Sequence, residues 1–179
     1  MTWLPRSEAE VSDTLVQPIP CALVINEASL YHAFRRIDEG RADLRKRISL
    51  VIGGHIDQDD SDGDFYSLAI ATLIRELDEE LKIGRLPSTA KPVGLVVDQS
   101  SLESSRHIAI VYEVAITGTI KPKAVEEFSM RSKYDGKPCT PDELLTIRKK
   151  FDPWSLIIFG DYINPSYSYD VGKQLSLSH

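Results

Sequence analysis

The stretch GGHIDQDDSDGDFYSLAIATLIRELDEELKIG, residues 53–84, decides the fold of this chain. It begins with a glycine pair, continues through an aspartate-rich loop and ends in a helix-like segment that contains RELDEE, residues 75–80. In that segment apolar residues recur at spacings of three and four, at Ile70, Leu73, Ile74, Leu77 and Leu81. This period lines up one apolar stripe. It predicts an amphipathic helix over residues 67–81, with Gly84 as its stop.

The glutamates of this helix share one face. Because each helical residue turns by about 100°, Glu76, Glu79 and Glu80 fall within one sector of about 100°, away from the leucines. Like charges at this spacing destabilise a helix, and Arg75 is expected to offset part of the repulsion by pairing with Glu79. Three carboxylates on a rigid surface suit Mg²⁺ or Mn²⁺, which prefer oxygen ligands. From the helix alone, a solvated acidic face remains the alternative.

Short apolar runs around this helix predict a β-sheet. The predicted strands cover residues 21–27, 30–37, 48–54, 92–98 and 107–117, and the first two form a hairpin. The last run is apolar throughout, which predicts that both of its faces are covered. N-cap signals at Thr140 and Asp152, each followed by proline, predict helices over residues 139–151 and 152–163, with Phe151 and Trp154 in the core. The predicted fold class is α/β, a mixed sheet with helices on both faces.

Length and charge limit the classes of function. A chain of 179 residues suits one domain, residues 1–179, with an N-terminal arm (1–17) and a C-terminal tail (164–179). The net charge of −6 argues against a nucleic-acid partner. No apolar run approaches the roughly 20 residues of a membrane span, and the N-terminus does not resemble a signal peptide. Cys21 and Cys139 lack metal-site spacing, which favours reduced thiols in a cytoplasmic protein.

A strand, a glycine pair and RELDEE on a helix together resemble the signature of the Nudix hydrolases. In that signature a glycine is followed after five residues by Glu, and after seven more by Arg-Glu-aliphatic-x-Glu-Glu-x-Gly-aliphatic. The second half matches at Arg75, Glu76, Leu77, Glu79, Glu80 and Ile83. The segments LPRSEAE, ISLVIGGHID, RHIAIVYEV and PDELL…DPWS resemble a MutT-like phosphoesterase branch. The resemblance therefore covers most of the chain.

The resemblance implies a Nudix-like α/β/α sandwich and a pyrophosphohydrolase activity. A metal-activated water would cleave a nucleoside-diphosphate-linked substrate, with Mg²⁺ (or Mn²⁺) as cofactor. The implied metal ligands are Glu76, Glu79 and Glu80; the catalytic candidates are Glu79, Glu76 and Glu127, with Glu126 weighed beside Glu127. The implied substrate-binding residues are Arg36, His55 and His107, each weighed against an ordinary structural role, and Gly53, Gly54 and Arg75 form the frame of the signature. Relatives of this kind are often homodimers.

The chain departs from the family pattern in two places. Arg75 follows Gly54 by 21 residues instead of 14, so the loop is seven residues longer, and Ser67 occupies the place eight before Arg75 where the pattern has Glu. We expect Asp62, Asp64 or another loop aspartate to brace the loop instead. The late glycine of the signature is Lys82. These departures concern the geometry of the loop and leave the metal-binding half of the signature intact.

Two rival functions remain open at this point. The altered first half of the signature is compatible with a non-catalytic Nudix-fold module that binds or senses a nucleotide. An isomerase on the same fold is the other rival, because isopentenyl diphosphate isomerases resemble Nudix proteins. That chemistry needs a cysteine in the pocket, and neither cysteine has an evident claim from the sequence.

Overall fold

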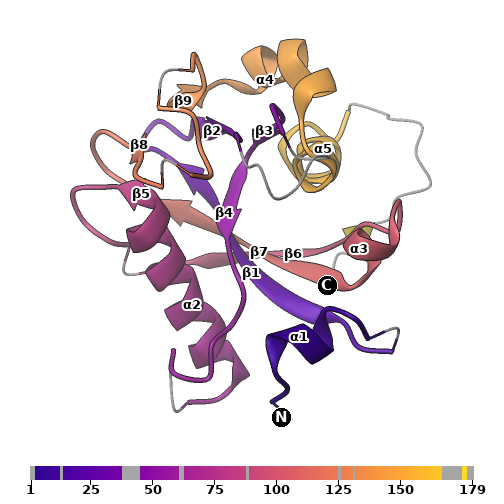
Figure 1. Cartoon of the computed structure of the whole chain (residues 1–179). Coiled ribbons are helices and arrows are strands. Elements are labelled where there is room, and N and C mark those ends of the chain that lie inside the picture. The colour runs from indigo at the N-terminus through magenta and orange to yellow at the C-terminus, as the bar shows by residue number, and fades with distance from the viewer. Residues whose placement is uncertain are drawn as a thin grey trace.

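The computed structural model describes residues 3–12, 14–37, 45–60, 63–87, 89–124, 126–130, 132–166 and 175–176. The strands are β1 (Gln17–Ile25), β2 (Tyr31–Arg35), β3 (Ile48–Ser49), β4 (Val51–Gly53), β5 (Leu81–Lys82), β6 (Lys91–Val97), β7 (His107–Ala115), β8 (Lys121–Pro122), β9 (Asp135–Cys139) and β10 (Leu175–Ser176). The helices are α1 (Arg6–Ala9), α2 (Phe65–Glu80), α3 (Leu102–Ser105), α4 (Pro141–Ile147) and α5 (Pro153–Ile158). Figure 1 shows their arrangement.

The main sheet is mixed, as predicted. Its strands run in the order β10-β6-β7-β1-β2-β3, with β4 paired to β1 and β9 paired to β2. Strand β1 runs parallel to β7 along its whole length, from Gln17↔His107 to Ile25↔Ala115, and the other pairings are antiparallel. Two strands pair with the other edge of β1: β4 along Cys21–Leu23 and β2 at Ile25.

Prolines keep the beginning of β1 unpaired on one edge. The Gln17 amide donates to the Arg106 carbonyl oxygen (2.8 Å), so odd-numbered amides of β1 face β7. The positions of Pro18 and Pro20 therefore face the opposite edge, where β4 pairs only from Cys21 onward. Proline has no N–H to offer a neighbouring strand. Among the described residues no strand pairs with β1 there, and the space beside it stays open.

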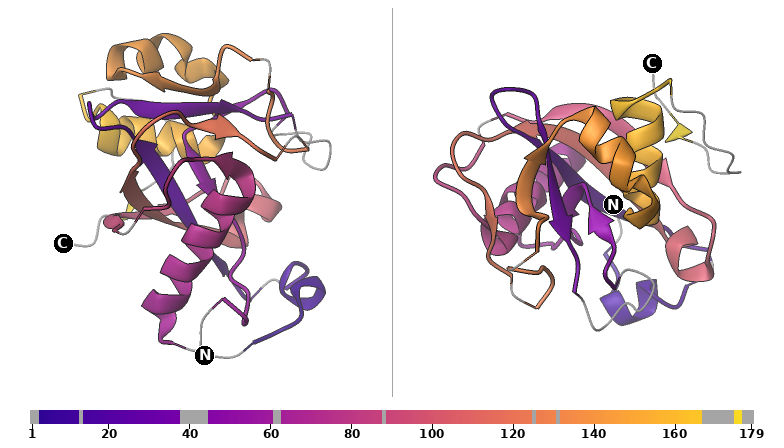
Figure 2. Two further views of the ribbon diagram at one scale, coloured as in Figure 1. Left: turned by 90° about the vertical axis from the view of Figure 1, so that its left-hand side faces the viewer. Right: turned by 90° about the horizontal axis from the view of Figure 1, so that it is seen from above.

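Helices cover both faces of the sheet, which confirms the predicted layers (Figure 2). On one face α2 packs its leucines against β1, β4 and β7, and this core contains Ala22, Val24, Ile52, Leu73, Leu77 and Val114. On the other face α4 and α5 close a second core, which contains Leu23, Val111, Leu144, Ile157 and Phe159. Strand β7 contributes Val111 to one core and Tyr112 to the other, so its predicted burial on both faces is confirmed.

Helix α2 differs from the prediction at both ends. Asp64 caps it by accepting a hydrogen bond from the Ser67 amide (2.9 Å), so it begins at Phe65. It ends at Glu80, because Leu81 is extended and starts β5, which pairs with β8 through Leu81↔Pro122. Gly84 as the helix stop was therefore wrong. A Cβ at Gly84 would meet nothing within 4 Å, so nothing there requires glycine.

The other predicted elements are confirmed with small changes. Thr140 and Glu143 form a capping box at the start of α4, and Asp152 caps α5. The predicted strand 48–54 is split into β3 and β4, because the Leu50 amide between them donates to the Ser155 hydroxyl (2.8 Å) instead of to a strand. A 3₁₀ turn, Arg148–Lys150, follows α4, and a π-helix, Phe159–Ile163, follows α5.

The C-terminal tail is not wholly loose. Within the predicted tail, Leu175–Ser176 forms β10 and pairs with β6 through Leu175↔Val96, whereas residues 167–174 and 177–179 lie outside the described residues. Within the part of the chain that the structure describes, no helix combines the length and apolar character needed to cross a membrane.

Candidate active site

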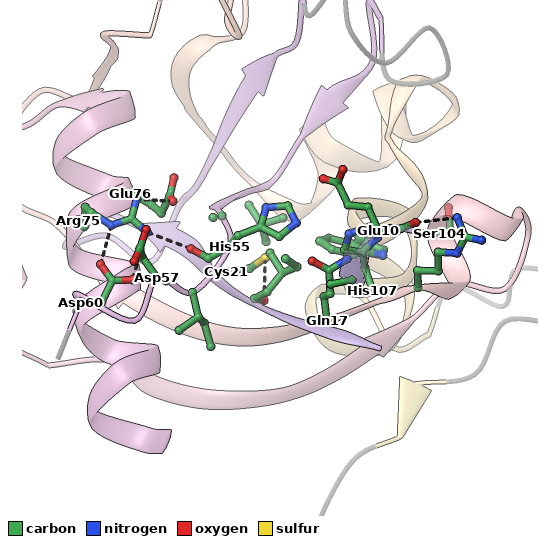
Figure 3. A pocket seen from close by; sticks show the side chains of 18 of the residues that line it. Glu10, Gln17, Cys21, His55, Asp57, Asp60, Arg75, Glu76, Ser104 and His107 are labelled. Atoms are coloured by element: carbon green, nitrogen blue, oxygen red, sulfur yellow. Dashed lines mark hydrogen bonds and ion pairs between the residues drawn. The ribbon is translucent and has the colours of Figure 1, made fainter. Parts of the chain in front are cut away.

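A pocket of about 1660 Å³ opens where β1, β4 and α2 meet the N-terminal arm and α5 (Figure 3). Its lining includes every site residue proposed from the sequence: Arg36, Gly53, Gly54, His55, Arg75, Glu76, Glu79, Glu80, His107 and Glu127. These residues come from segments far apart in the chain. The fold therefore gathers the proposed site residues around one cavity, although their individual roles remain proposals.

The three glutamates of α2 share the pocket but not the same environment. The Glu79 side chain is 58% exposed, whereas Glu80 is only 6% exposed. Glu80 ends the helix, and the chain after β8 closes over it: the Lys123 and Ala124 amides donate to the Glu80 carbonyl oxygen (2.6 and 3.2 Å). The three glutamates of the acidic face thus differ in exposure, from Glu79 at 58% through Glu76 at 12% to the buried Glu80.

Glu80 is a buried acid without a hydrogen-bond partner on one oxygen. Burial raises the pKa of the Glu80 carboxyl to about 9; the nearby Glu127 charge adds to this, and Arg36 opposes it. Among the described residues its Oε2 atom is buried and accepts no hydrogen bond. Buried polar atoms are nearly always bonded in native proteins. An orphaned carboxylate oxygen that faces further carboxylates is therefore a place where a cation would be stabilised.

Glu127 and Arg36 line the pocket as a bonded pair. The Arg36 Nη2 donates to Glu127 Oε2 (3.0 Å), and the guanidinium carbon lies 5.2 Å from the centroid of the Phe128 ring. The Ile37 amide donates to the Glu127 carbonyl oxygen (2.8 Å), which fixes the backbone that carries this carboxylate. Glu126 is exposed and does not line the pocket. Of Glu126 and Glu127, only Glu127 therefore lines the pocket.

Asp60 braces the loop through Arg75. Arg75 donates from Nε to Asp60 Oδ1 (2.6 Å) and from Nη2 to Asp60 Oδ2 (3.2 Å), and Thr72 Oγ1 donates to the same Oδ2 (2.6 Å). Burial would raise the pKa of the Asp60 carboxyl, but the hydrogen bonds from Arg75 and Thr72 outweigh it and hold the pKa at about 2. Arg75 also donates to the His55 carbonyl oxygen (2.9 Å) and to Glu76 Oε1 (2.7 Å). One guanidinium thus joins loop, strand end and helix.

Asp60 is the other loop aspartate that the prediction from the sequence allowed for, whereas neither of the two aspartates named there is seen to brace the loop. Asp64 caps α2 instead, and Asp62 lies outside the described residues. Counting back from Arg75 led to Ser67, because the loop insertion lies between the brace and the arginine. Counting forward from Gly54 finds Asp60 after five residues, at the place of the family glutamate. The expected pair of Arg75 with Glu79 is present at 3.4 Å, but it is longer than the contacts of Arg75 with Asp60 (2.6 Å) and Glu76 (2.7 Å).

The two glycines make room for neighbouring groups. A Cβ at Gly53 would approach the Cys21 Cα to 2.9 Å and would clash with the Pro20 carbonyl oxygen, so β4 could not pair with β1. A Cβ at Gly54 would overlap the carboxylate of Glu76. Gly54 therefore sets the position of that carboxylate, and Arg75 holds it there.

Replacing Gly54 by alanine is expected to displace the Glu76 carboxylate and to lower divalent-metal affinity about 10- to 100-fold. The stability loss should be small, because the three atoms nearest to the new methyl group all belong to the end of the flexible Glu76 side chain. Calorimetric titration with Mn²⁺ and thermal melting would measure both effects. Gly84→Ala is the matched control, since its Cβ meets nothing. Equal metal affinity in the two variants would contradict this role of Gly54.

Two histidines and a cysteine line the middle of the pocket. The His55 and His107 rings meet edge to face with centroids 5.5 Å apart. Cys21, for which the sequence made no claim, also lines the pocket, with its Sγ donating to the Ile19 carbonyl oxygen (3.4 Å). Burial raises the pKa of this thiol far above its usual value, and Asp152 and Glu80 add to the effect. The thiol is therefore a neutral part of the pocket floor.

The donor set fits a hard divalent cation by its chemistry. Glu76, Glu79, Glu80 and Glu127 supply only oxygen ligands, as Mg²⁺ and Mn²⁺ prefer, and the orphaned Glu80 oxygen lies among them. Within the described ranges, no three His, Cys, Asp or Glu side chains stand arranged to hold a metal ion.

This chain is similar to one curated protein in sequence and to several solved structures in fold. No family model matches the chain. It is 27% identical to Protein YmaB of Bacillus subtilis (strain 168) over 156 residues, which cover 86% of this chain and 74% of that protein. Its fold is similar to that of Tm1382, a candidate Nudix hydrolase, with a TM-score of 0.72, 20% identity, and coverage of 90% of this chain and 78% of that one.

Two further structures extend the comparison. The MutT protein of Methanosarcina mazei Go1 has a TM-score of 0.61 and 17% identity, and the match covers 88% of this chain and 99% of that chain. A bifunctional NMN adenylyltransferase/ADP ribose pyrophosphatase from Francisella tularensis, complexed with AMP and a Mn ion, has a TM-score of 0.53 and 17% identity, with coverage of 86% and 43%. This chain has a mixed sheet between helical layers, and its strand β4 ends at a glycine pair, from which a loop leads to the glutamate-rich helix α2. This is the fold of the Nudix hydrolases.

Proposed function

We propose that this protein is a Mg²⁺- or Mn²⁺-dependent hydrolase that cleaves the pyrophosphate bond of a nucleoside-diphosphate-linked substrate. One observation carries the proposal: the buried Glu80 oxygen without a hydrogen-bond partner, in a pocket that it shares with Glu76, Glu79 and Glu127. Such strained electrostatics concentrate at functional sites. The fold neighbours support the proposal, since one of them is a bifunctional NMN adenylyltransferase/ADP ribose pyrophosphatase complexed with AMP and a Mn ion.

We assign a separate role in this reaction to each of the charged site residues. Glu76, Glu79 and Glu80 would hold the cation, which when bound neutralises the pyrophosphate and acidifies a water molecule. Arg36, whose Nε is buried without a partner among the described residues, would donate to a substrate phosphate oxygen. Glu127, fixed by Arg36 and by its own backbone, or one of the α2 glutamates would accept the proton of the attacking water.

The histidines would contact the substrate rather than the cation. His55 follows the glycine pair, and its carbonyl oxygen is held by Arg75, so its ring position is coupled to the brace. His107 opens β7 and meets the His55 ring. We propose that both line the path between the phosphates and the rest of the substrate.

Both cysteines are free and buried, which supports the cytoplasmic location expected from the sequence.

A Mg²⁺- and Mn²⁺-dependent activity screen tests the proposal. The panel contains nucleoside triphosphates, dinucleoside polyphosphates, nucleotide sugars and pyridine dinucleotides, each with the metal and with excess chelator. We expect cleavage of at least one substrate that the chelator abolishes. No cleavage in either metal, at substrate concentrations where calorimetry shows binding, would replace the hydrolase by the nucleotide-sensing module.

One contact favours the sensing module as the second candidate. Arg75 donates to Glu76 and so occupies an oxygen that the hydrolase needs as a metal ligand. If Arg75 keeps this bond when a nucleotide binds, the pocket would bind the nucleotide without cleaving it.

A homodimer remains a prediction for either function, and multi-angle light scattering would check it.

A further inference from the structure

We propose that His32, a buried residue outside the pocket, is a positioning residue that makes the pair of Arg36 and Glu127 sensitive to pH. Its ring holds the strand that follows the Glu127 segment, and a second proton on that ring would loosen the hold. The inference rests on the proposed function for the role of this pair at the substrate phosphates. It goes beyond that function, because it concerns how the site is supported and not what the site binds.

His32 lies in β2 and holds the neighbouring strand β9 through its side chain. The two strands pair side by side (Figure 1), but their register shifts between Ala33 and Phe34, which leaves Gly136 as a bulge between two pairs. His32 Nδ1 donates to the Gly136 carbonyl oxygen (2.7 Å). Because a carbonyl oxygen only accepts hydrogen bonds, Nδ1 carries the proton of the neutral ring.

The other ring nitrogen of His32 makes no hydrogen bond within the part of the chain that the structure describes. This Nε2 atom is buried, and the whole residue is only 3% exposed. A proton on Nε2 would place an N–H group and a positive charge where water does not reach them, which is costly. The protonated ring is hydrated only if it moves away from its present neighbours or if β9 opens.

A row of rings leads from His32 to Arg36. His32, Phe34 and Arg36 are alternate residues, so their side chains share one face of β2 and its continuation. The rings of His32 and Phe34 stack with their centroids 6.5 Å apart, and Phe34 meets the Phe128 ring at 5.8 Å. The Arg36 guanidinium carbon lies 5.2 Å from the centroid of the Phe128 ring. A displaced imidazole would therefore change the packing beneath the guanidinium.

Backbone hydrogen bonds connect the same two segments. The Ile37 amide donates to the Glu127 carbonyl oxygen (2.8 Å). Farther along, the Arg35 amide donates to the Tyr134 carbonyl oxygen (2.7 Å), directly before β9 begins. The bond from the imidazole to the bulge is the next contact in this direction. Opening β9 at the bulge would therefore loosen the segment that carries the Glu127 carboxylate.

Burial, rather than a charged side chain, sets the protonation of His32. Burial lowers the pKa of its ring below the usual value of 6.5, and the Gly136 carbonyl oxygen opposes this only in part. The strands β1 and β3, which also pair with β2, contain no charged residue. The charged side chains of β9 have partners on other elements: Asp135 with Lys121 of β8 (3.0 Å) and Lys137 with Glu143 of α4 (2.9 Å).

The sign of the pH effect follows from this burial. Since the unfolded chain takes up the proton more readily than the folded ring, the stability that neutral His32 contributes is complete well above pH 6.5 and falls as pH drops below it. Two acids also face the pair of Arg36 and Glu127. The pKa of Glu80 is raised to about 9, so Glu80 titrates at higher pH. Burial raises the pKa of Glu76 toward the range of His32, so the test needs a variant that changes His32 alone.

The test follows the His32 ring and the site in one NMR titration of the metal-free protein, from about pH 8 to about pH 5. In wild-type protein the ring signals and the backbone amide signals of Arg36 and Glu127 should shift with one common midpoint below pH 6.5. His32→Asn keeps an N–H donor for Gly136 but does not titrate, so this component of the amide shifts should disappear. His179→Asn, which removes another histidine of the sequence, is the control and should keep it.

Binding of inorganic pyrophosphate gives the expected size of the effect. Calorimetry at about pH 7.5 and about pH 5.5 would compare wild-type protein with His32→Asn. Lowering the pH should weaken binding about 3- to 10-fold more in wild-type protein, because one pH unit below the unfolded pKa of histidine shifts a linked equilibrium by up to about tenfold. A residue that affected only global stability would leave this ratio unchanged.

The outcomes separate this inference from the proposed function. Amide signals of Arg36 and Glu127 that move identically in wild-type protein and His32→Asn overturn the inference, whether or not the protein cleaves a substrate. A common titration in a protein that cleaves nothing overturns the hydrolase and keeps the role of His32. If His32→Asn does not fold, wild-type protein decides alone: a ring that stays neutral until the protein unfolds, or whose midpoint differs from that of the amides, overturns the inference.

Discussion

Glu80→Gln is expected to stabilise the metal-free protein while removing its Mg²⁺-dependent turnover. The glutamine keeps the size of the side chain but has no carboxyl that folding must keep protonated, so the free energy of unfolding should rise by about 1–3 kcal/mol, or roughly 3–10 °C in Tm. Because the pKa of Glu80 is raised to about 9, the folded protein holds a proton that the unfolded chain releases. The advantage of glutamine should therefore grow as pH rises between about 4.5 and 9.

Glu79→Gln is the matched variant on the same helix. Glu79 is mostly exposed, so its charge is already solvated and its replacement should leave Tm almost unchanged. Both variants should lower turnover on the order of 100-fold or more, the size of effect expected when one group that stabilises the transition state is lost. Melting curves in excess chelator, together with steady-state rates in Mg²⁺, distinguish them. Unchanged turnover in Glu79→Gln would refute the metal-ligand assignment.

Asp60→Asn is expected to open the site without touching a proposed metal ligand. Both oxygens of Asp60 accept hydrogen bonds, and an amide would present N–H groups to donors on Arg75, Thr72 or the Asp57 amide. The Asp60 side chain is only 4% exposed, but Arg75 is one-third exposed, so water compensates part of the loss. We expect the free energy of unfolding to fall by about 2 kcal/mol, with a loss of Mn²⁺ affinity because Arg75 no longer positions Glu76.

The pH dependence gives a second readout for Asp60. Its pKa of about 2 lies below its unfolded value, so its contribution to stability is complete above about pH 4 and disappears as pH falls toward 2. Acid titrations of wild-type protein and Asp60→Asn should therefore diverge above pH 4 and converge near pH 2. Asp59→Asn, on the same loop but exposed, removes one charge without the brace. An identical acid profile for the two variants would show that Asp60 does not brace the loop.

The main helices and the longer strands of this fold were predictable because their signals are local, whereas β9, which pairs with β2, was not predicted. The leucine period placed α2, and proline after Thr140 and Asp152 marked the beginnings of α4 and α5. The C-terminus of α2 was mispredicted, since Gly84 is a local signal and the true end depends on pairing of Leu81 with Pro122, about 40 residues away. No residue pattern near Glu80 indicates that Leu81 pairs with Pro122.

The candidate site, too, was predictable where the signal is local and unpredictable where it depends on distant segments. The spacing of RELDEE within one helix is enough to show that three carboxylates share a face, because helix geometry relates neighbouring residues directly. Which carboxylate is buried and which aspartate meets Arg75 depend on loops and strands that approach from elsewhere in the chain. Burial and hydrogen bonding are properties of those approaches. That three glutamates share one helix face thus follows from their spacing in the sequence. The burial of Glu80 arises only when the chain after β8 packs on α2, and the brace arises only when the loop brings Asp60 to Arg75.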